Sequence, residues 1–346
     1  MASFSALVLD QTLGLVWSLW TELGVSGWQR RHAAVAIDPE PLVLFTATLG
    51  DADRRLQDEA TDWCIRYGRY LSVARLRHLL AKSPEGVRTA FGPLAATVNA
   101  HAPLHWPEAT EPRVYQPSRR SKVKDFCPAA LIALRLRALF GVSARAEIVR
   151  VFLAHPISTY SAANLAPEVG YTKRNVADAL ENLRMGGLLE VLPAGNQLRY
   201  GLKRPVHLLS TIGELPAVFP TWATLLRTLW VINEHALRIE LLEPIVAAVE
   251  ARVALRRMAP DLQLVGVQMP PDAGGEHALP TFERWALELV AGWASGDPAW
   301  LTPRDVLRNR PSTAANAGGI TGNQAEVGDL QAGRAKRTPI LTDSSG

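Results

Sequence analysis

Apolar residues recur every three or four positions along most of the chain, which is the repeat of an amphipathic helix. The clearest stripes, each predicting one apolar helix face, are Leu56-Ala60-Trp63-Cys64-Tyr67, Trp222-Leu225-Leu226-Leu229-Ile232-Ala236, Ile245-Val246-Val249-Val253 and Phe282-Trp285-Ala286-Leu289-Val290-Trp293. A strand-like pattern is confined to residues 188–202. The sequence therefore predicts a mainly α protein with one small β-hairpin.

Changes in composition divide the chain into five segments. Prolines punctuate the stretch before residue 128, and proline interrupts both helix and sheet. From about Asn309 onward large apolar residues are scarce, so this part is predicted to be a disordered tail. The expected segments are an α-helical domain (1–100), a Pro-rich basic linker (101–127), a central domain (128–204), a C-terminal helical domain (205–308) and the tail (309–346).

The apolar segment Phe4 to Leu23 raises the question of a membrane span. It contains Asp10 and Glu22, and no cationic stretch precedes it, so a core helix is expected rather than a span or a signal peptide. The only cysteines, Cys64 and Cys127, are far apart. This spacing argues against a disulfide framework or a Cys-based zinc site and is typical of a cytoplasmic protein.

Residues 142–202 contain the most informative pattern. Ser143 and Ser161 are expected to cap two helices, Gly170-Tyr171 forms a turn, and Thr172 caps a third helix. This third helix carries polar and cationic residues in its first turn and apolar residues behind them, and it ends near Gly186-Gly187. The strand candidates "LLEVL" and "QLRYGL" follow, joined by "PAGN" with its hairpin-type turn signal.

The segment "SAANLAPEVGYTKRNVADALENLRMGGLLEV" resembles the winged helix-turn-helix domain of MarR- and ArsR-like transcription regulators. The resemblance covers residues 142–202 only. It implies that the third helix enters the major groove of double-stranded DNA with its N-terminus first. The DNA-binding residues that it implies are Thr172, Lys173, Arg174 and Asn175 on the helix, and Asn196, Gln197 and Arg199 on the wing.

Each first-turn side chain has a chemistry suited to such a contact. Lys173 is a point charge for a phosphate, Arg174 can pair bidentately with guanine, and Asn175 can pair with adenine. The free N–H groups at the helix start also favour a phosphate. The apolar residues behind them, Val176, Ala179, Leu180 and Leu183, are expected to hold the helix on its core.

Charge is distributed unevenly along the chain. The total formal charge is only +4, but residues 113–204 hold 15 Lys and Arg against 6 Asp and Glu, a local net charge of +9. The stretch Arg113 to Lys124 contributes five of these cations without an acid. Within it, residues 119–124 are either a solvated linker or an arm for the minor groove. A basic block of this kind is the electrostatic footprint of a phosphate binder.

Other functions stay open. A winged helix can serve protein–protein contact alone, and an antitoxin-like or defence-locus regulator would use its helical domains to bind a partner protein. Signals for an enzyme are weak: Asp51-x-Asp53 fits a helix cap, Pro103 between His101 and His105 disfavours a helical metal pair, and no G-x-G-x-x-G or P-loop pattern occurs.

We therefore expect a cytoplasmic, sequence-specific transcription regulator without enzymatic activity, cofactor or metal. Its central winged helix-turn-helix would lie between helical N- and C-terminal domains. By analogy with such regulators, the apolar C-terminal helices predict a homodimer.

Overall fold

The computed structural model describes residues 2–27, 29–194, 197–271 and 274–302. The protein is mainly helical, with 64% helix and one small antiparallel hairpin, as the apolar periodicity predicts. None of the described helices is long and apolar enough to cross a membrane. The segment that raised this question is helix α1 (Phe4–Glu22), whose Leu15, Leu19 and Trp20 are fully buried.

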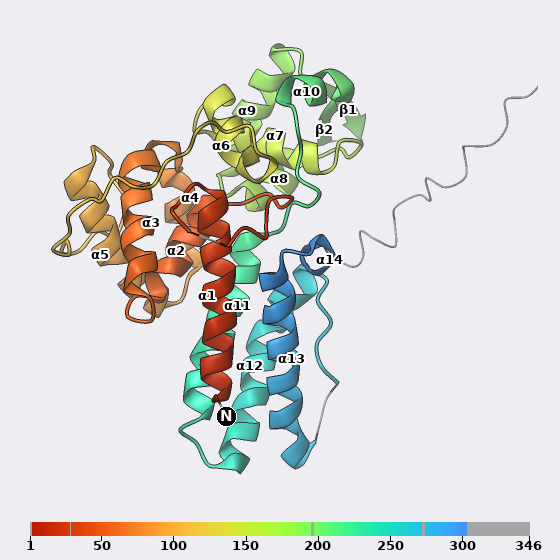
Figure 1. Cartoon of the computed structure of the whole chain (residues 1–346). Helices are drawn as coiled ribbons and strands as arrows, with labels where there is room; N and C mark the ends of the chain where they lie inside the picture. Colours follow the sequence, from red (N-terminus) through yellow and green to blue (C-terminus); the bar gives the residue numbers. More distant parts are fainter. Residues whose placement is uncertain (1, 28, 195–196, 272–273, 303–346) are drawn as a thin grey trace, which may run out of the picture. The chain divides into compact units, whose positions relative to one another are not determined.

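Figure 1 shows the elements in chain order. The remaining helices are α2 (Pro39–Thr48), α3 (Arg54–Tyr67), α4 (Val73–Lys82), α5 (Glu85–His101), α6 (Ile132–Phe140), α7 (Ala144–Ala154), α8 (Ala162–Val169), α9 (Lys173–Met185), α10 (Pro205–Ile212), α11 (Trp222–Ile239), α12 (Pro244–Leu264), α13 (Ala278–Ser295) and α14 (Pro298–Leu301). The hairpin consists of β1 (Leu189–Ala194) and β2 (Gln197–Leu202).

Buried apolar residues form two clusters. The first, here called the outer core, contains residues of α1–α5 together with residues of α11–α14. Helix α1 packs against α11 and α13, so the N-terminal and C-terminal helices share this core. Its largest fully buried side chains are Trp20, Trp63, Trp222 and Trp293. The domain boundaries at residues 100 and 205 stay predictions.

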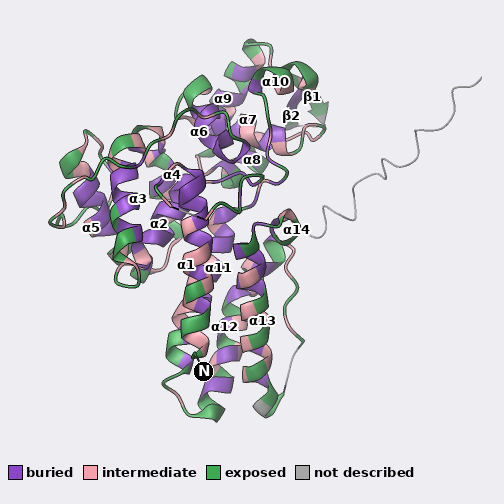
Figure 2. Cartoon of the chain, in the orientation of Figure 1, coloured by how far each residue is buried: buried purple, intermediate pink, exposed green. Residues whose placement is uncertain are grey.

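The second cluster, here called the central core, lies among α6, α7, α8, α9, the hairpin and α10. Figure 2 shows that the inward sides of these elements are buried. The residues with no exposed surface include Ile132, Ile148, Val149, Phe152, Leu165, Val169, Val176 and Leu180.

Three of the four apolar stripes face the outer core. The stripes on α3, α11 and α13 are buried apart from Tyr67 and Trp285, which are half-buried. The fourth stripe forms α12 as expected, but Ile245, Val246 and Val249 are exposed on it. Between α12 and α13 lies a short 3-10 helix, η3 (Gly275–His277).

The basic stretch before α6 forms neither helix nor strand, and it is attached to the protein. The Lys122 N–H donates to the Gly24 carbonyl, the Val123 N–H donates to the Tyr67 hydroxyl, and Ser121 is fully buried. These bonds bind the backbone to the outer helices, so this stretch is neither a free arm nor a fully solvated linker. The side chains of Arg119, Arg120, Lys122 and Lys124 nevertheless face solvent. The tail beyond Asn309 lies outside the described residues.

Candidate nucleic-acid interface

Helices α8 and α9 form a capped helix–turn–helix. The Ser161 hydroxyl and the Asn164 side chain form a capping box at the start of α8. Gly170 ends α8 in the left-handed conformation with φ 71°, which a residue with a Cβ rarely adopts. The Thr172 hydroxyl then accepts a hydrogen bond from the Asn175 N–H at 3.3 Å and caps α9. The two predicted caps and the glycine turn are therefore confirmed.

The first turn of α9 is free of core packing. The predicted residues Thr172, Lys173, Arg174 and Asn175 are all exposed, and they adjoin one another at the helix start. Immediately behind them, Val176 and Leu180 have no exposed surface. The helix is therefore held by its middle, while its N–H groups and cationic side chains remain open to solvent.

The hairpin lies directly after α9 in the chain. In β1 and β2, Val191 pairs with Tyr200 and Leu192 pairs with Arg199. Tyr160, between α7 and α8, makes an additional antiparallel bridge to Tyr200, with hydrogen bonds of 3.0 and 2.8 Å. This bridge places the segment before α8 beside the hairpin, in the position of a third strand.

Two of the three predicted wing residues, Gln197 and Arg199, lie on β2. Arg199 is half-buried, and its guanidinium donates to the Thr159 hydroxyl at 2.9 Å and to the Thr159 carbonyl. Gln197 begins β2 opposite Ala194. Asn196, together with the turn predicted at Gly195-Asn196, lies outside the described residues.

The structure also places cations near α9 that were not among the predicted site residues. Arg145, at the exposed start of α7, lines a groove together with Tyr171 and Asn175. Lys203, just beyond β2, lines a second groove together with Arg184 at the far end of α9. Only their positions in the sequence could have indicated a role for these two cations, because Arg145 follows a helix cap and Lys203 follows the hairpin. Their distance from α9 in the sequence concealed their proximity to it.

The local charge of +9 overstates the positive charge that a ligand can reach. Arg135 donates to the carbonyls of Phe126, Ile212 and Glu214, and Arg137 is 2% exposed. Arg184 is paired with Glu181. A sum over the sequence cannot separate such internal cations from surface cations, and it also omits acids that come from distant segments.

Those distant acids belong to a buried charge network between the outer helices and α7. Glu40, fully buried on α2, accepts hydrogen bonds from Arg75 at 2.6 Å and from Arg137 at 2.8 Å. Arg75 also makes a bidentate pair with Asp38, at 2.7 and 2.6 Å. Arg137 in turn donates to Glu147 of α7 at 2.9 and 2.8 Å. Each ion thus has an opposite partner, which offsets the cost of removing it from water.

The carboxyl groups of this network differ in their protonation. Burial raises the pKa of Glu40 above its ordinary value, and the charges of Arg137 and Arg75 only partly oppose this. Burial acts in the same direction on Glu147, but the charges of Arg137, Arg75 and Arg150 outweigh it and lower its pKa to about 2. Glu147 is therefore the firmly ionised partner that joins α7 to the arginines.

One hydrogen bond extends from this network to the turn before α9. The hydroxyls of Ser72 and Tyr171 are 2.7 Å apart, and the Ser72 N–H donates to Glu40 at 2.6 Å. Ser72 also caps α4, because its hydroxyl accepts from the Arg75 N–H at 3.2 Å. The start of α9 is thus attached to α4 and α2 by polar contacts that no sequence pattern indicates.

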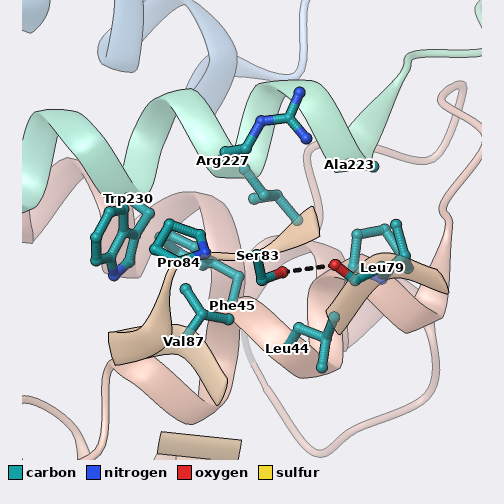
Figure 3. Close-up of a pocket in the computed structure, with 11 residues that line it drawn as sticks. Leu44, Phe45, Leu79, Ser83, Pro84, Val87, Ala223, Arg227 and Trp230 are labelled. Atoms are coloured by element: carbon teal, nitrogen blue, oxygen red, sulfur yellow. Dashed lines mark hydrogen bonds between the residues drawn. The ribbon is translucent and has the colours of Figure 1, made fainter. Parts of the chain in front are cut away.

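A groove away from α9 is mainly apolar. Figure 3 shows an apolar groove between α2, α4, α5 and α11, lined by Phe45, Val87 and Trp230. Its one hydroxyl side chain, Ser83, donates to the Leu79 carbonyl at 2.8 Å. Asp53 caps α3, as predicted. Over residues 2–302, apart from the short gaps in the description, no three His, Cys, Asp or Glu side chains are grouped as a metal site requires.

Comparisons of the chain with protein-family models, with curated proteins and with solved structures found no match.

Proposed function

We propose that the protein binds double-stranded DNA in a sequence-specific manner and regulates transcription, with α9 as the helix that contacts the bases. The observation that carries the proposal is the first turn of α9. Its cationic and amide side chains are exposed, while Val176 and Leu180 fix the same helix to the central core. A helix that is held in this way can enter the major groove with its N-terminus without losing its own packing.

The surroundings of α9 support the same function. The order α7, α8, α9 and hairpin, with the Tyr160–Tyr200 bridge beside the hairpin, is the arrangement expected of a winged helix-turn-helix. Arg145 and Lys203 are exposed cations beside α9, on grooves that also hold the acids Asp178 and Glu190. Cations placed in this way suit the phosphates on either side of a groove.

The test separates base contacts from phosphate contacts within one helical turn. The full chain is first used to select its preferred duplex from a random pool. Lys173→Ala should weaken binding to every sequence about equally and reduce the salt slope by roughly one unit. Arg174→Ala should cost roughly 1–3 kcal/mol on the selected duplex and relax the preference at one base position.

Arg184→Ala is the matched control, because Arg184 lies on the same helix but is paired with Glu181. It should bind both selected and scrambled duplexes as the unchanged protein does. If the first-turn variants melt normally and still bind the selected duplex at full strength, α9 does not contact the bases. A module for protein–protein contact would then be the better explanation of this region.

A further inference from the structure

Helix α12 has two apolar faces, and the described residues cover only one of them. The covered face consists of small residues, Ala247, Ala251 and Ala254, followed by Met258. The other face carries larger side chains that remain in solvent. Their exposed fractions are 79% for Ile245, 48% for Val246, 49% for Val249 and 38% for Val253, with Leu241 at 86% in the turn before the helix.

These exposed residues form one continuous surface, here called the α12 stripe. Leu241, Ile245, Val249 and Val253 are spaced four residues apart, so within the helix they lie on the same side. Single exposed apolar residues are ordinary, but a contiguous apolar surface marks an interaction site. Helix stability does not account for it either, because Val and Ile are poorer helix formers than the alanines on the covered face.

Charged residues at the two ends of the stripe indicate what covers it. Glu243 lies at the N-terminal end and Arg256 lies beyond Val253 at the other end. Both side chains are exposed, and neither forms an ion pair with any residue that the structure describes. The stripe is therefore acidic at one end and basic at the other.

A second copy of this chain fits this polarity in one orientation. If two α12 helices pack antiparallel about a two-fold axis between Val249 and Glu250, each Glu243 faces the partner's Arg256. The same axis brings Val246 opposite the partner's Val253. A parallel arrangement would instead place like charges together, which opposes association. A two-fold interface of this kind uses the same surface on both chains.

We propose that the protein is a homodimer in which the α12 stripes of two chains pack antiparallel. The interface is formed by the valines and Ile245 at its centre and by the two Glu243–Arg256 pairs at its ends. It involves no residue of α9 or the hairpin, so it stands whether or not the protein binds DNA.

The first test introduces a charge at the centre of the stripe. Sedimentation of the full chain over a range of concentrations should give a dimer, and Val249→Asp should give a monomer with an unchanged far-UV spectrum. Val114→Asp is the control, since Val114 is fully exposed in the stretch before α6 and should leave the dimer intact. A monomer for the unchanged chain, or a dimer for Val249→Asp, would overturn the proposal.

A second test depends on orientation and does not disturb the apolar contact. Glu243→Arg and Arg256→Glu should each weaken self-association by roughly tenfold or more, because like charges then face each other at both ends. An equimolar mixture of the two variants should form a heterodimer as tight as the original dimer, because every end pair is again of opposite charge. A mixture that associates no better than either variant alone would rule out the antiparallel arrangement.

Discussion

Helices α9 and α12 both bury one face, but their exposed faces have opposite chemistry. Helix α9 buries its large apolar residues, such as Leu180, and exposes Lys173 and Arg174. In its N-terminal half, helix α12 buries alanines, such as Ala251, and exposes larger apolar residues, such as Val249. Small side chains allow helix axes to approach closely, so an alanine face can form the covered side. Large apolar residues of a helix therefore do not always point into its own chain.

The two helices also differ in how their surroundings are held. The region of α9 is attached to the outer helices by the buried charge network and by the contact between Ser72 and Tyr171. Helix α12 packs on α11 and α13 through apolar side chains, which are alanines followed by Met258 and Leu262. The first attachment depends on complete pairing of charges, whereas the second depends on apolar packing.

The largest expected effect follows from breaking the buried charge network. Arg137→Ala removes the guanidinium that donates to both Glu40 and Glu147, so we expect a loss of roughly 3–5 kcal/mol in the free energy of unfolding. Chemical denaturation followed by circular dichroism measures it. Arg184→Ala removes an exposed ion pair of α9 and should leave the unfolding midpoint almost unchanged. Equal unfolding midpoints for the two variants would show that the buried charge network stabilises the protein no more than the exposed ion pair does.

A second prediction compares the buried face of α9 with the exposed face of α12. Leu180→Ala leaves a cavity in the central core and should cost roughly 2–5 kcal/mol at every protein concentration. Val249→Ala removes methyl groups only from the proposed dimer contact, so its effect on thermal unfolding should disappear on dilution. Melting curves over a dilution series separate the two. A concentration-independent loss for Val249→Ala would mean that this residue packs within its own chain.

The smallest predicted effect concerns the cap of α9. Thr172→Ala removes the hydroxyl that accepts from the Asn175 N–H and should destabilise the protein by about 1 kcal/mol. Ser143→Ala is the matched control, because Ser143 occupies the cap position of α7 without bonding to a helix N–H. Thermal melting of both variants measures whether Thr172→Ala loses more stability than Ser143→Ala. A larger loss for Ser143→Ala would show that capping does not define the start of α9.

Local sequence patterns predicted most of the central region. The serine and threonine caps, the left-handed Gly170 and the strand patterns of β1 and β2 act over three to eight residues, so they can be recognised without distant contacts. The exposure of Thr172 to Asn175 followed from the same reasoning, because apolar residues begin only at Val176. The position of Ser143 as a cap was also correct, although its hydroxyl bonds elsewhere.

Contacts between distant segments escaped prediction. Asp38 and Glu40 lie at the start of α2, and they are the buried partners of Arg75 and Arg137. The cations Arg145 and Lys203 lie near α9 because α7 and the hairpin pack against the same core. Neither arrangement leaves a signal in the spacing of residues.

The sequence by itself determined the helices, their caps, the hairpin and the polar start of α9, because these depend on neighbours along the chain. Only the tertiary structure decided which cations are internal, which helices share the outer core and which face of α12 remains open. These outcomes depend on what each surface meets after folding. A stripe such as Ile245 to Val253 has the same periodicity whether it packs within its own chain or against another.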